Sequence, residues 1–543
     1  MIPSNKILKF RLSACAACVL FFLTGASFVS HLGLQNDESL FANAIYKPYA
    51  VAYSFKLGHS TLPFMLMSYL GTLKAWLYRP VFSLFGTGTV PMRGPMLLAG
   101  VASIWLFYLF LRRIAGERAA LLGCGLLATD SMYLLTTCFD WGPVALQHLL
   151  LTAGMLLLVK FYQQSSHRSL AWGCFLLGLA MWDKALAVWM LSGMGIGLLA
   201  VFTKKIVGVI TLRRLAISIL CFCLGALPLI LYNVHTRLGT FRGNASWDTS
   251  ELPVKARLLR ATADGSAMFG WLIQDDWQTK NPHQPEGLVE ASSAKISALL
   301  ANPRHNLLLY AFALALLLAP LARGNALKAI LFALIALLIA WAQMAVTANA
   351  GGSVHHAILI WPLPQIVIAV SFASASRRLG SAGIPALAVI LVLLMGSGLL
   401  VTNEYYALMI RNGGSLNWTD AIFRLSDYLN GGSPEGIYCI DWGMMDSLRL
   451  LSKGKLPLRV GTDPINKPQL DPADRDFLAH VVAEPRNLYI NHTKDFEFFT
   501  GVNGKLVEFA RSAGFTRRVL AVIPDSNGRP VYEVYQFDGP AVP

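Results

Sequence analysis

The stretch KFRLSACAACVLFFLTGASFVSHLGLQNDESLFANA, residues 9–44, joins a long apolar run to an adjacent acid pair. The apolar part, near residues 9–30, has the length that a helix needs to cross a bilayer, roughly 20 residues. Its basic N-terminal flank is also typical of signal peptides, but the run is long for one and SFVSHLGLQ is a poor cleavage site. We therefore predict a retained first membrane span, followed directly by Asp37 and Glu38.

The rest of the 543-residue chain keeps this apolar character. Hydrophobic residues make up 55% of the sequence and charged residues only 14%, which is typical of membrane proteins and too apolar for one soluble core. About eleven windows have the length and composition of a spanning helix. They lie near residues 9–30, 94–111, 119–137, 143–159, 169–182, 185–203, 215–233, 305–322, 326–346, 357–376 and 383–402. We predict a polytopic α-helical membrane protein with about eleven transmembrane helices.

Basic residues give the predicted orientation. The formal net charge of +15 would suit a nucleic-acid-binding protein, but the basic residues lie in short links between apolar windows. Every second link is basic, as at Arg112 and Arg113 or at Arg377 and Arg378, and this is the positive-inside pattern. We expect a multi-pass protein of the cell inner (plasma) membrane, with a cytoplasmic N-terminus and no nucleic-acid partner. An odd number of spans makes the C-terminus extracytoplasmic, which is periplasmic in a Gram-negative cell.

Two domains are predicted. Residues 1–402 form the transmembrane domain, with large extracytoplasmic loops at 31–93 and 234–304. In the first loop, LPFMLMSYLGTLKAWLYRPVFSLF predicts helices that lie in the interface, because another crossing would reverse all later basic links. Residues 403–543 have the composition and the strand and helix patterns of a soluble α/β domain, ending in a hairpin across a DSNG turn.

Ionisable residues at span ends are the main functional signal. Asp183 and Lys184, in AMWDKALAVW, interrupt two apolar windows with almost no loop, and charged groups in the hydrocarbon are costly and usually functional. The other clusters at predicted outer ends are Asp37 and Glu38, Asp140 in TTCFDWGP, and His355 and His356 in GGSVHHAILIWPLP. Each of these alone also suits a solvated loop, a helix cap or an interfacial side chain. Because all four clusters are predicted on the same, outer side of the membrane, we expect them to form one shared site.

Carboxylates, a buried lysine and a histidine at the outer surface of a membrane bundle suit group transfer from a lipid-phosphate donor. A cation would hold the phosphate while a carboxylate activates the incoming hydroxyl. Attack opposite the leaving group gives inversion at the sugar carbon, by analogy with inverting glycosidases. A divalent metal ion bound by Glu38 and His356 is a further hypothesis.

Six segments resemble the GT-C superfamily of polyprenyl-phosphate-sugar-dependent glycosyltransferases, which contains the protein O-mannosyltransferases and the bacterial lipid A aminoarabinose transferase. The segments are NDESLFANA, LFGTGTVPMRGPMLLAG, LLATDSMYLLTTCFD, LLGLAMWDKALAVW, ALPLILYNVHTRLGTF and HHAILIWPLPQIVIA. They cover the predicted membrane domain. Two features depart from the family: Lys184 is followed by Ala185 rather than glycine, and the first loop has GHSTLP instead of a Lys-Pro-Pro run.

The resemblance implies catalytic roles for three acids. Asp37 would be the base that activates the acceptor, and Glu38 would help to bind the acceptor or a metal. Asp140 matches the acid of the second loop.

The resemblance also implies a donor site and partners. Lys184 would hold the donor phosphate, and Arg93 matches the arginine that opens the second span. The further site candidates are Asp183, His355 and His356. The implied partners are a polyprenyl-phosphate-linked sugar, an extracytoplasmic acceptor (a glycan, lipid or protein) and the lipid bilayer.

Three other functions fit parts of the sequence. A multispan transporter or flippase for a lipid-linked or polar substrate predicts charges at the bilayer midplane, broken helices and an inverted repeat. A scaffolding membrane protein leaves Asp183 and Lys184 without a role. A ligase or polymerase that uses a pyrophosphate-linked glycan shares the outward-facing site, so the sequence barely separates it from the transferase.

Overall fold

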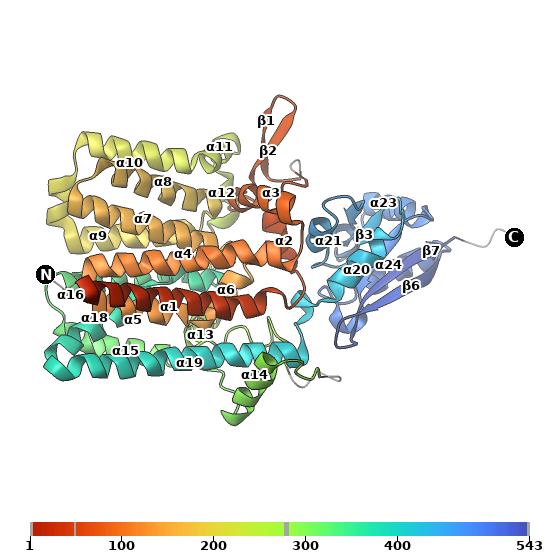
Figure 1. Ribbon diagram of the computed structural model, residues 1–543. Coiled ribbons are helices and arrows are strands. Elements are labelled where there is room, and N and C mark those ends of the chain that lie inside the picture. Colours follow the sequence, from red (N-terminus) through yellow and green to blue (C-terminus); the bar gives the residue numbers. More distant parts are fainter. Residues whose placement is uncertain (1–3, 48–49, 276–281, 540–543) are drawn as a thin grey trace.

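The computed structural model describes residues 4–47, 50–275 and 282–539. It consists of a helical bundle and a smaller C-terminal domain, which is attached at the end of the bundle opposite to the N-terminus (Figure 1). The bundle helices are α1 (Ser4–Val29), α4 (Thr89–Ala115), α5 (Glu117–Ala128), α6 (Ser131–Cys138), α7 (Ala145–Gln164), α8 (His167–Asp183), α9 (Ala187–Val209), α10 (Leu212–Gly225), α11 (Leu227–His235), α15 (Leu308–Leu318), α16 (Asn325–Val346), α17 (Val354–Ala357), α18 (Leu363–Arg378) and α19 (Gly383–Asn412).

The chain is a multi-pass membrane protein. Within the described residues, six helical stretches are long and apolar enough to cross a membrane; they include α1, α4, α7, α16, α17 with α18, and α19. The pairs α5 with α6 and α10 with α11 pass the same test together but bend by 57° and 74°. Each of the eleven predicted windows is helical, but α8, α15 and the apolar part of α9 are short, so eleven crossings stay a prediction.

Glycines allow the bundle helices to approach closely. A side chain at Gly178 on α8 would meet the carbonyl oxygen of Phe222 on α10 at 2.2 Å, and one at Gly225 would meet the carbonyl oxygen of Phe175 at 2.3 Å. Small residues at such crossings let backbones pack without a hydrophobic driving force between helices. This packing fixes the position of α8, whose last residue is a site candidate.

The segment between α1 and α4 differs from the helices that were expected at the membrane interface. It contains α2 (Asn36–Asn43), a hairpin of β1 (Tyr53–Leu57) and β2 (Ser60–Met65), and α3 (Leu73–Phe85). The prediction of a helix was wrong for the first residues of the stretch that begins LPFM, which extend along β2, whereas its second half forms the helix α3. The Pro63 carbonyl oxygen accepts hydrogen bonds from Thr72 Oγ1 and Trp76 Nε1 at 2.6 and 2.8 Å, which ties the hairpin to α3.

The segment between α11 and α15 holds α12 (Gly239–Asn244), α13 (Leu252–Asp264) and α14 (Leu288–Leu299). The change in composition after residue 402 does not end the last bundle helix, since α19 continues to Asn412. Tyr405 explains the extension: its ring stacks on Phe269 at 3.8 Å and its hydroxyl donates to the Gly265 carbonyl oxygen at 2.9 Å. The polar residues after 402 therefore pack on the segment between α11 and α15.

The C-terminal domain is built on one mixed sheet. Its elements are α20 (Ala421–Asn430), β3 (Ile437–Cys439), α21 (Met445–Leu451), β4 (Leu458–Val460), α22 (Thr462–Ile465), α23 (Pro472–Ala483), β5 (Leu488–His492), α24 (Val502–Ser512), β6 (Thr516–Pro524) and β7 (Pro530–Asp538). The strand order is β4-β3-β5-β7-β6. Strand β3 pairs in parallel with β4 and β5, while β7 is antiparallel to β5 and β6.

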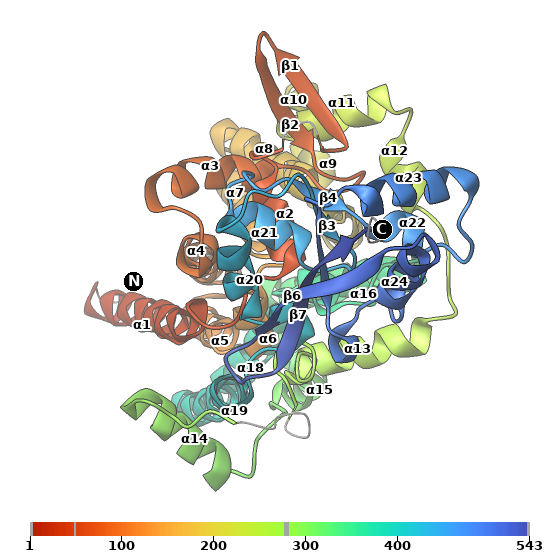
Figure 2. The same cartoon turned by 90° about the vertical axis from the view of Figure 1, so that its right-hand side faces the viewer.

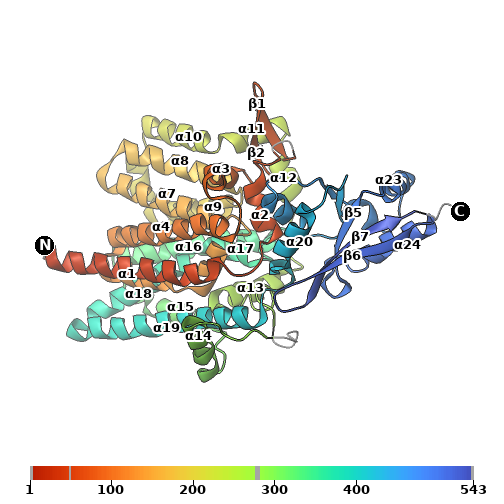
Figure 3. The same cartoon turned by 45° about the vertical axis from the view of Figure 1, so that its right-hand side comes forward.

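Helices cover both faces of this sheet. One apolar core contains side chains of α20 and α21, and the other contains side chains of α23 and α24. Figure 2 views the molecule from the C-terminal domain, with the β1–β2 hairpin projecting to one side. Figure 3 shows α2 between the bundle and this domain. Helix α21 of this domain thus packs on α2, at the end of the bundle that carries the acid pair.

Candidate active site

The sequence around the acid pair encodes its own helix start. Gln35 is the N-cap of α2, and its Oε1 accepts from the backbone N–H groups of Asp37 and Glu38 at 2.6 and 3.0 Å. Glu38 Oε2 in turn accepts from the Gln35 N–H at 3.4 Å, which completes a capping box. The positive end of the helix dipole favours both carboxylates in the first turn. Local sequence therefore fixes where Asp37 and Glu38 lie.

Glu38 is held by Arg93. Arg93 Nε and Nη2 donate to the two Glu38 carboxylate oxygens at 2.8 and 3.1 Å, and both side chains are fully buried. The remaining Arg93 N–H groups donate to the carbonyl oxygens of Val29, His31, Leu32 and Gly33. The guanidinium is thus occupied by the turn between α1 and α2. This geometry favours a structural role for Arg93 over the phosphate-binding role expected from the resemblance.

Asp37 is the less constrained member of the pair. Its side chain is partly buried, and Asn36 Nδ2 donates to Asp37 Oδ1 at 3.4 Å. The pKa of Asp37 is raised to about 6, mainly by burial and also by the charge of Asp446, while hydrogen bonds from Asn36 and Gln35 act in the opposite direction. A carboxylate with a pKa near the working pH is suited to accept a proton from a hydroxyl.

Asp140 lies in a buried ion pair with Lys74 of α3. Lys74 Nζ contacts Asp140 Oδ2 at 2.8 Å and donates to the Asp140 carbonyl oxygen at 2.9 Å. Asp140 Oδ1 accepts from the N–H groups of Val144 and Ala145 at 2.6 and 3.1 Å. Asp140 therefore anchors Lys74 and the start of α7, which favours a positioning role over direct catalysis.

Asp183 and Lys184 lie at the break between α8 and α9, and both are buried. Lys184 Nζ donates to the Gly142 carbonyl oxygen at 2.7 Å. Among the described residues, Asp183 Oδ2 has no hydrogen-bond partner, and the carboxyl group lies within electrostatic range of Asp140, Lys74 and Lys184. Two acids and two lysines therefore share one buried region.

The two histidines lie beside this region. The rings of His355 and His356 are 4.3 Å apart, and the His355 ring lies 5.7 Å from that of Trp141. Gly142 links them to Lys184, because its Cα packs so tightly on the His355 ring that a Cβ would come within 2.5 Å. Within the described part of the chain, His356 Nδ1 is buried without a hydrogen-bond partner.

Two contacts connect the acid pair to the lysine region. Arg93 lies over the ring of Phe139, 4.6 Å from its centroid, directly before Asp140 in the chain. The Tyr69 carbonyl oxygen accepts from the Ala185 N–H at 2.9 Å, and the charge of Asp37, after burial, raises the pKa of the Tyr69 phenol. The predicted site residues therefore form one connected set at the end of the bundle that faces the C-terminal domain.

Comparisons with known proteins identify the fold. The sequence profile of the dolichyl-phosphate-mannose-protein mannosyltransferase family matches residues 71–230, a range that includes Lys74, Asp140 and Lys184. The structure of ArnT from Cupriavidus metallidurans bound to undecaprenyl phosphate is similar over 98% of both chains, with a TM-score of 0.58 and 12% identity. The chain has the GT-C fold.

Other GT-C proteins match over nearly the whole chain. The archaeal oligosaccharyltransferase AglB from Archaeoglobus fulgidus, in complex with an inhibitory peptide and a dolichol-phosphate, has a TM-score of 0.52 and 12% identity over 99% of this chain and 75% of its own. A mutant of the arabinofuranosyltransferase AftD from Mycobacteria has a TM-score of 0.51 and 14% identity over 99% of this chain and 42% of its own. No curated protein sequence matches the chain significantly. The resemblance to the GT-C superfamily is confirmed.

The residues of this GT-C bundle do not fit the expected metal site. Both Glu38 carboxylate oxygens contact Arg93. Across the ranges that the structure describes, no group of three or more His, Cys, Asp or Glu side chains could hold a metal ion. Metal dependence stays a prediction from the sequence, and loss of activity on chelation with recovery on adding a divalent cation would support it.

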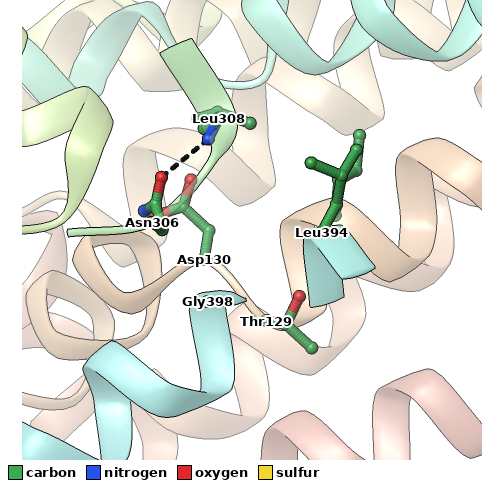
Figure 4. Close-up of a pocket in the computed structure, with 7 residues that line it drawn as sticks. Thr129, Asp130, Asn306, Leu308, Leu394 and Gly398 are labelled. Carbon is green, nitrogen blue, oxygen red and sulfur yellow. Dashed lines mark hydrogen bonds between the residues drawn. The ribbon is translucent and has the colours of Figure 1, made fainter. Parts of the chain in front are cut away.

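A small cavity elsewhere in the bundle is not a substrate site. Figure 4 shows Thr129, Asp130, Asn306, Leu394 and Gly398 around it. Its volume is about 10 Å³, which is space for one water molecule at most. Asp130 accepts hydrogen bonds from Trp361 Nε1 and Gln365 Nε2, so this buried carboxyl group has a structural role.

Lys74 is the main site residue that sequence reasoning missed. It occurs in LKAWLYRP, where a lysine among apolar residues is typical of an interfacial helix with its charge in water. In the structure its side chain is buried and paired with Asp140. One sequence signal could have shown that Lys74 is buried. Residues four positions apart lie on the same face of a helix, and Tyr78, four residues after Lys74 in α3, is also buried.

Proposed function

We propose that this chain is an integral membrane glycosyltransferase that moves a sugar from a polyprenyl-phosphate donor to an extracytoplasmic acceptor with inversion. The observation that carries the proposal is that a partly exposed carboxylate, Asp37, lies at the same end of a GT-C bundle as the buried cations Lys74 and Lys184 and is linked to the Lys184 segment through Tyr69. The lipid phosphates named for the ArnT and AglB structures, undecaprenyl phosphate and a dolichol-phosphate, support a lipid-linked donor here.

In the proposed reaction Asp37 accepts the proton of an acceptor hydroxyl. The hydroxyl oxygen attacks the anomeric carbon of the sugar, and the bond from that carbon to the phosphate oxygen breaks with its electron pair on the phosphate. Lys184 stabilises the charge that develops there. The products are the glycosylated acceptor and the polyprenyl phosphate, and the attack from the opposite face inverts the sugar carbon.

The proposed orientation places the acid pair and the C-terminal domain outside the inner membrane and the N-terminus in the cytoplasm. The alternation of basic links supports it. The two bent helix pairs are a feature that the transporter hypothesis also expects, but the charged site residues gather at one end of the bundle rather than along a path through it. This distribution favours the transferase.

Comparing cells with and without the gene tests the function. A surface glycan that lacks one residue, together with accumulation of its lipid-linked donor, is expected for the transferase. Unchanged glycans with altered solute uptake would favour the transporter instead. Transfer by the purified protein from a polyprenyl-phosphate sugar then establishes the donor.

The pH dependence of transfer is expected to follow Asp37. Because the base must be ionised, kcat/KM should fall about tenfold per pH unit below the pKa of about 6 and level off above it. An aspartate with its ordinary pKa, about 3.9, would keep full activity to about pH 5. The measurement is kcat/KM from about pH 4.5 to 8, with enzyme stability checked at each pH; a flat profile over this range contradicts the assignment.

Lys184→Ala is expected to raise the donor KM by about 10- to 100-fold, because a hydrogen bond to a charged group contributes roughly 1.5–3 kcal/mol. The acceptor KM should change little. Lys56→Ala, which removes an exposed lysine from the hairpin, is the matched control. An unchanged donor KM in a folded Lys184→Ala protein would remove Lys184 from the phosphate site.

A further inference from the structure

The acid-pair helix α2 is docked on α21 of the C-terminal domain through buried polar groups. Asn43 Nδ2 donates to Asp446 Oδ1 at 3.1 Å and to the Asp446 carbonyl oxygen at 3.2 Å. The Asp446 N–H donates to Asn36 Oδ1 at 3.0 Å. Asn36 and Asn43 flank Asp37 on the first and last turns of the same short helix, so Asp446 contacts α2 at both ends.

A neighbouring residue adds a contact at the start of α2. Ser447 Oγ donates to the Leu34 carbonyl oxygen at 2.8 Å, and Ser39 Oγ lies 3.5 Å from Ser447 Oγ. These side chains are buried. Buried amides and hydroxyls are costly to leave without partners, and these groups find theirs across the junction. The eight-residue α2 is too short to be stable alone, so its orientation depends on α21.

Apolar packing closes the same junction. Leu450 of α21 belongs to one buried cluster with Leu34, Ala42 of α2, and Tyr78 and Phe82 of α3. The C-terminal domain, α2 and α3 therefore share one core, and the polar contacts of Asp446 lie beside it. Movement of the domain would open this core as well as break the hydrogen bonds.

We propose that Asp446 of the C-terminal domain is a positioning residue for transfer: it holds α2 so that Asp37 faces the acceptor, and it places a second carboxylate near that base. This inference rests on the proposed function. It makes the C-terminal domain a part of the active site rather than an accessory that only binds glycans.

The negative charge of Asp446 acts electrostatically on Asp37. The pKa of Asp37 is raised by burial and then by Asp446, so removing this charge lowers the pKa. Burial raises the pKa of Asp446 itself, while Arg449, Asn43 and Lys47 act in the opposite direction. The charged or titratable groups near α2 are Asp446 and Arg449 on α21, Lys74, Tyr78 and Arg79 on α3, Arg93 on α4, Glu38 on α2, and Tyr46, Lys47 and Tyr69 in the segments that follow α2 and β2.

The test compares D446N with wild type in the full-length protein in detergent or vesicles. The amide keeps the size of the side chain and removes its charge. We call the fall of kcat/KM at low pH its acid limb. We expect the acid limb to move to lower pH, by on the order of half a pH unit, and kcat at neutral pH to fall. D427N, which changes an exposed carboxylate on α20, should leave both unchanged. A D446N protein with the wild-type limb and the wild-type kcat would overturn the inference.

A second variant covers the case in which D446N does not fold. N43S removes the α2 amide from Asp446 and keeps the Asp446 charge, so we expect a lower kcat with an unmoved acid limb and an unchanged donor KM. Wild-type kcat in N43S would overturn the positioning role. Failure of the proposed function is distinguishable, because wild-type protein would then show no transfer from any polyprenyl-phosphate sugar.

Discussion

Asp37→Asn is expected to lower kcat for sugar transfer by about 10²- to 10⁴-fold, the usual contribution of a general base. Asparagine keeps the shape of the side chain but cannot accept the proton of the acceptor hydroxyl. The donor phosphate is proposed to bind at Lys184, at the break between α8 and α9, so the donor KM should stay within a few-fold. Initial rates of transfer at varied concentrations of a defined polyprenyl-phosphate sugar measure both quantities.

The fold of this variant should be intact. The pKa of Asp37 is raised in the folded protein, so the ionised carboxylate destabilises the fold at a pH above about 6, and a neutral amide removes this cost. The unfolding temperature of Asp37→Asn at pH 7 should therefore equal or exceed that of wild type. Near-normal turnover by a folded Asp37→Asn protein would remove Asp37 as the base.

Arg93→Met is expected to have the largest effect on stability, a loss of about 3–5 kcal/mol, because it leaves Glu38 charged and buried without its partner. The variant also removes the hydrogen bonds to the turn between α1 and α2. We expect poor accumulation in the membrane and a strongly lowered unfolding temperature. Thermal unfolding of the detergent-solubilised protein measures the effect.

Two further variants separate pairing from packing. Replacing both Arg93 and Glu38 by methionine removes the unpaired charge and should recover part of the lost stability. Arg79→Met changes an exposed arginine on α3 and should alter stability by less than about 0.5 kcal/mol. If Arg93→Met is as stable as wild type but has a higher donor KM, Arg93 binds phosphate as the resemblance implies and is not structural.

The sequence predicts best the features that depend on local pattern. Each apolar window forms a helix because roughly 20 apolar residues have few other stable arrangements in a membrane. The place of Asp37 directly after the first span was also predictable, but the cap at Gln35 that begins α2 was not, because glutamine is not a preferred N-cap residue.

Features set by tertiary packing were not predictable in this way. Lys74 has the sequence context of an exposed interfacial lysine, and only the position of α3 against Asp140 buries it. Arg93 and Asp140 are recognisable as polar residues at span ends, but their hydrogen-bond partners come from distant segments. Strand β1, with the sequence YSFKL, alternates apolar and polar residues as a strand does, whereas the apolar run that begins LPFM in β2 suits a strand or a helix.

The balanced charges around Lys184 have a consequence for the catalytic cycle. Asp140 and Asp183 match Lys74 and Lys184 in number, so in the ionised state the four groups are electroneutral before a donor arrives. A phosphodiester adds one negative charge, and the phosphate monoester left after transfer carries about −1.5 to −2 near pH 7. Under the proposed function, each turnover would therefore leave more negative charge beside Lys184 than the donor brought, and this surplus would favour release of the spent lipid carrier.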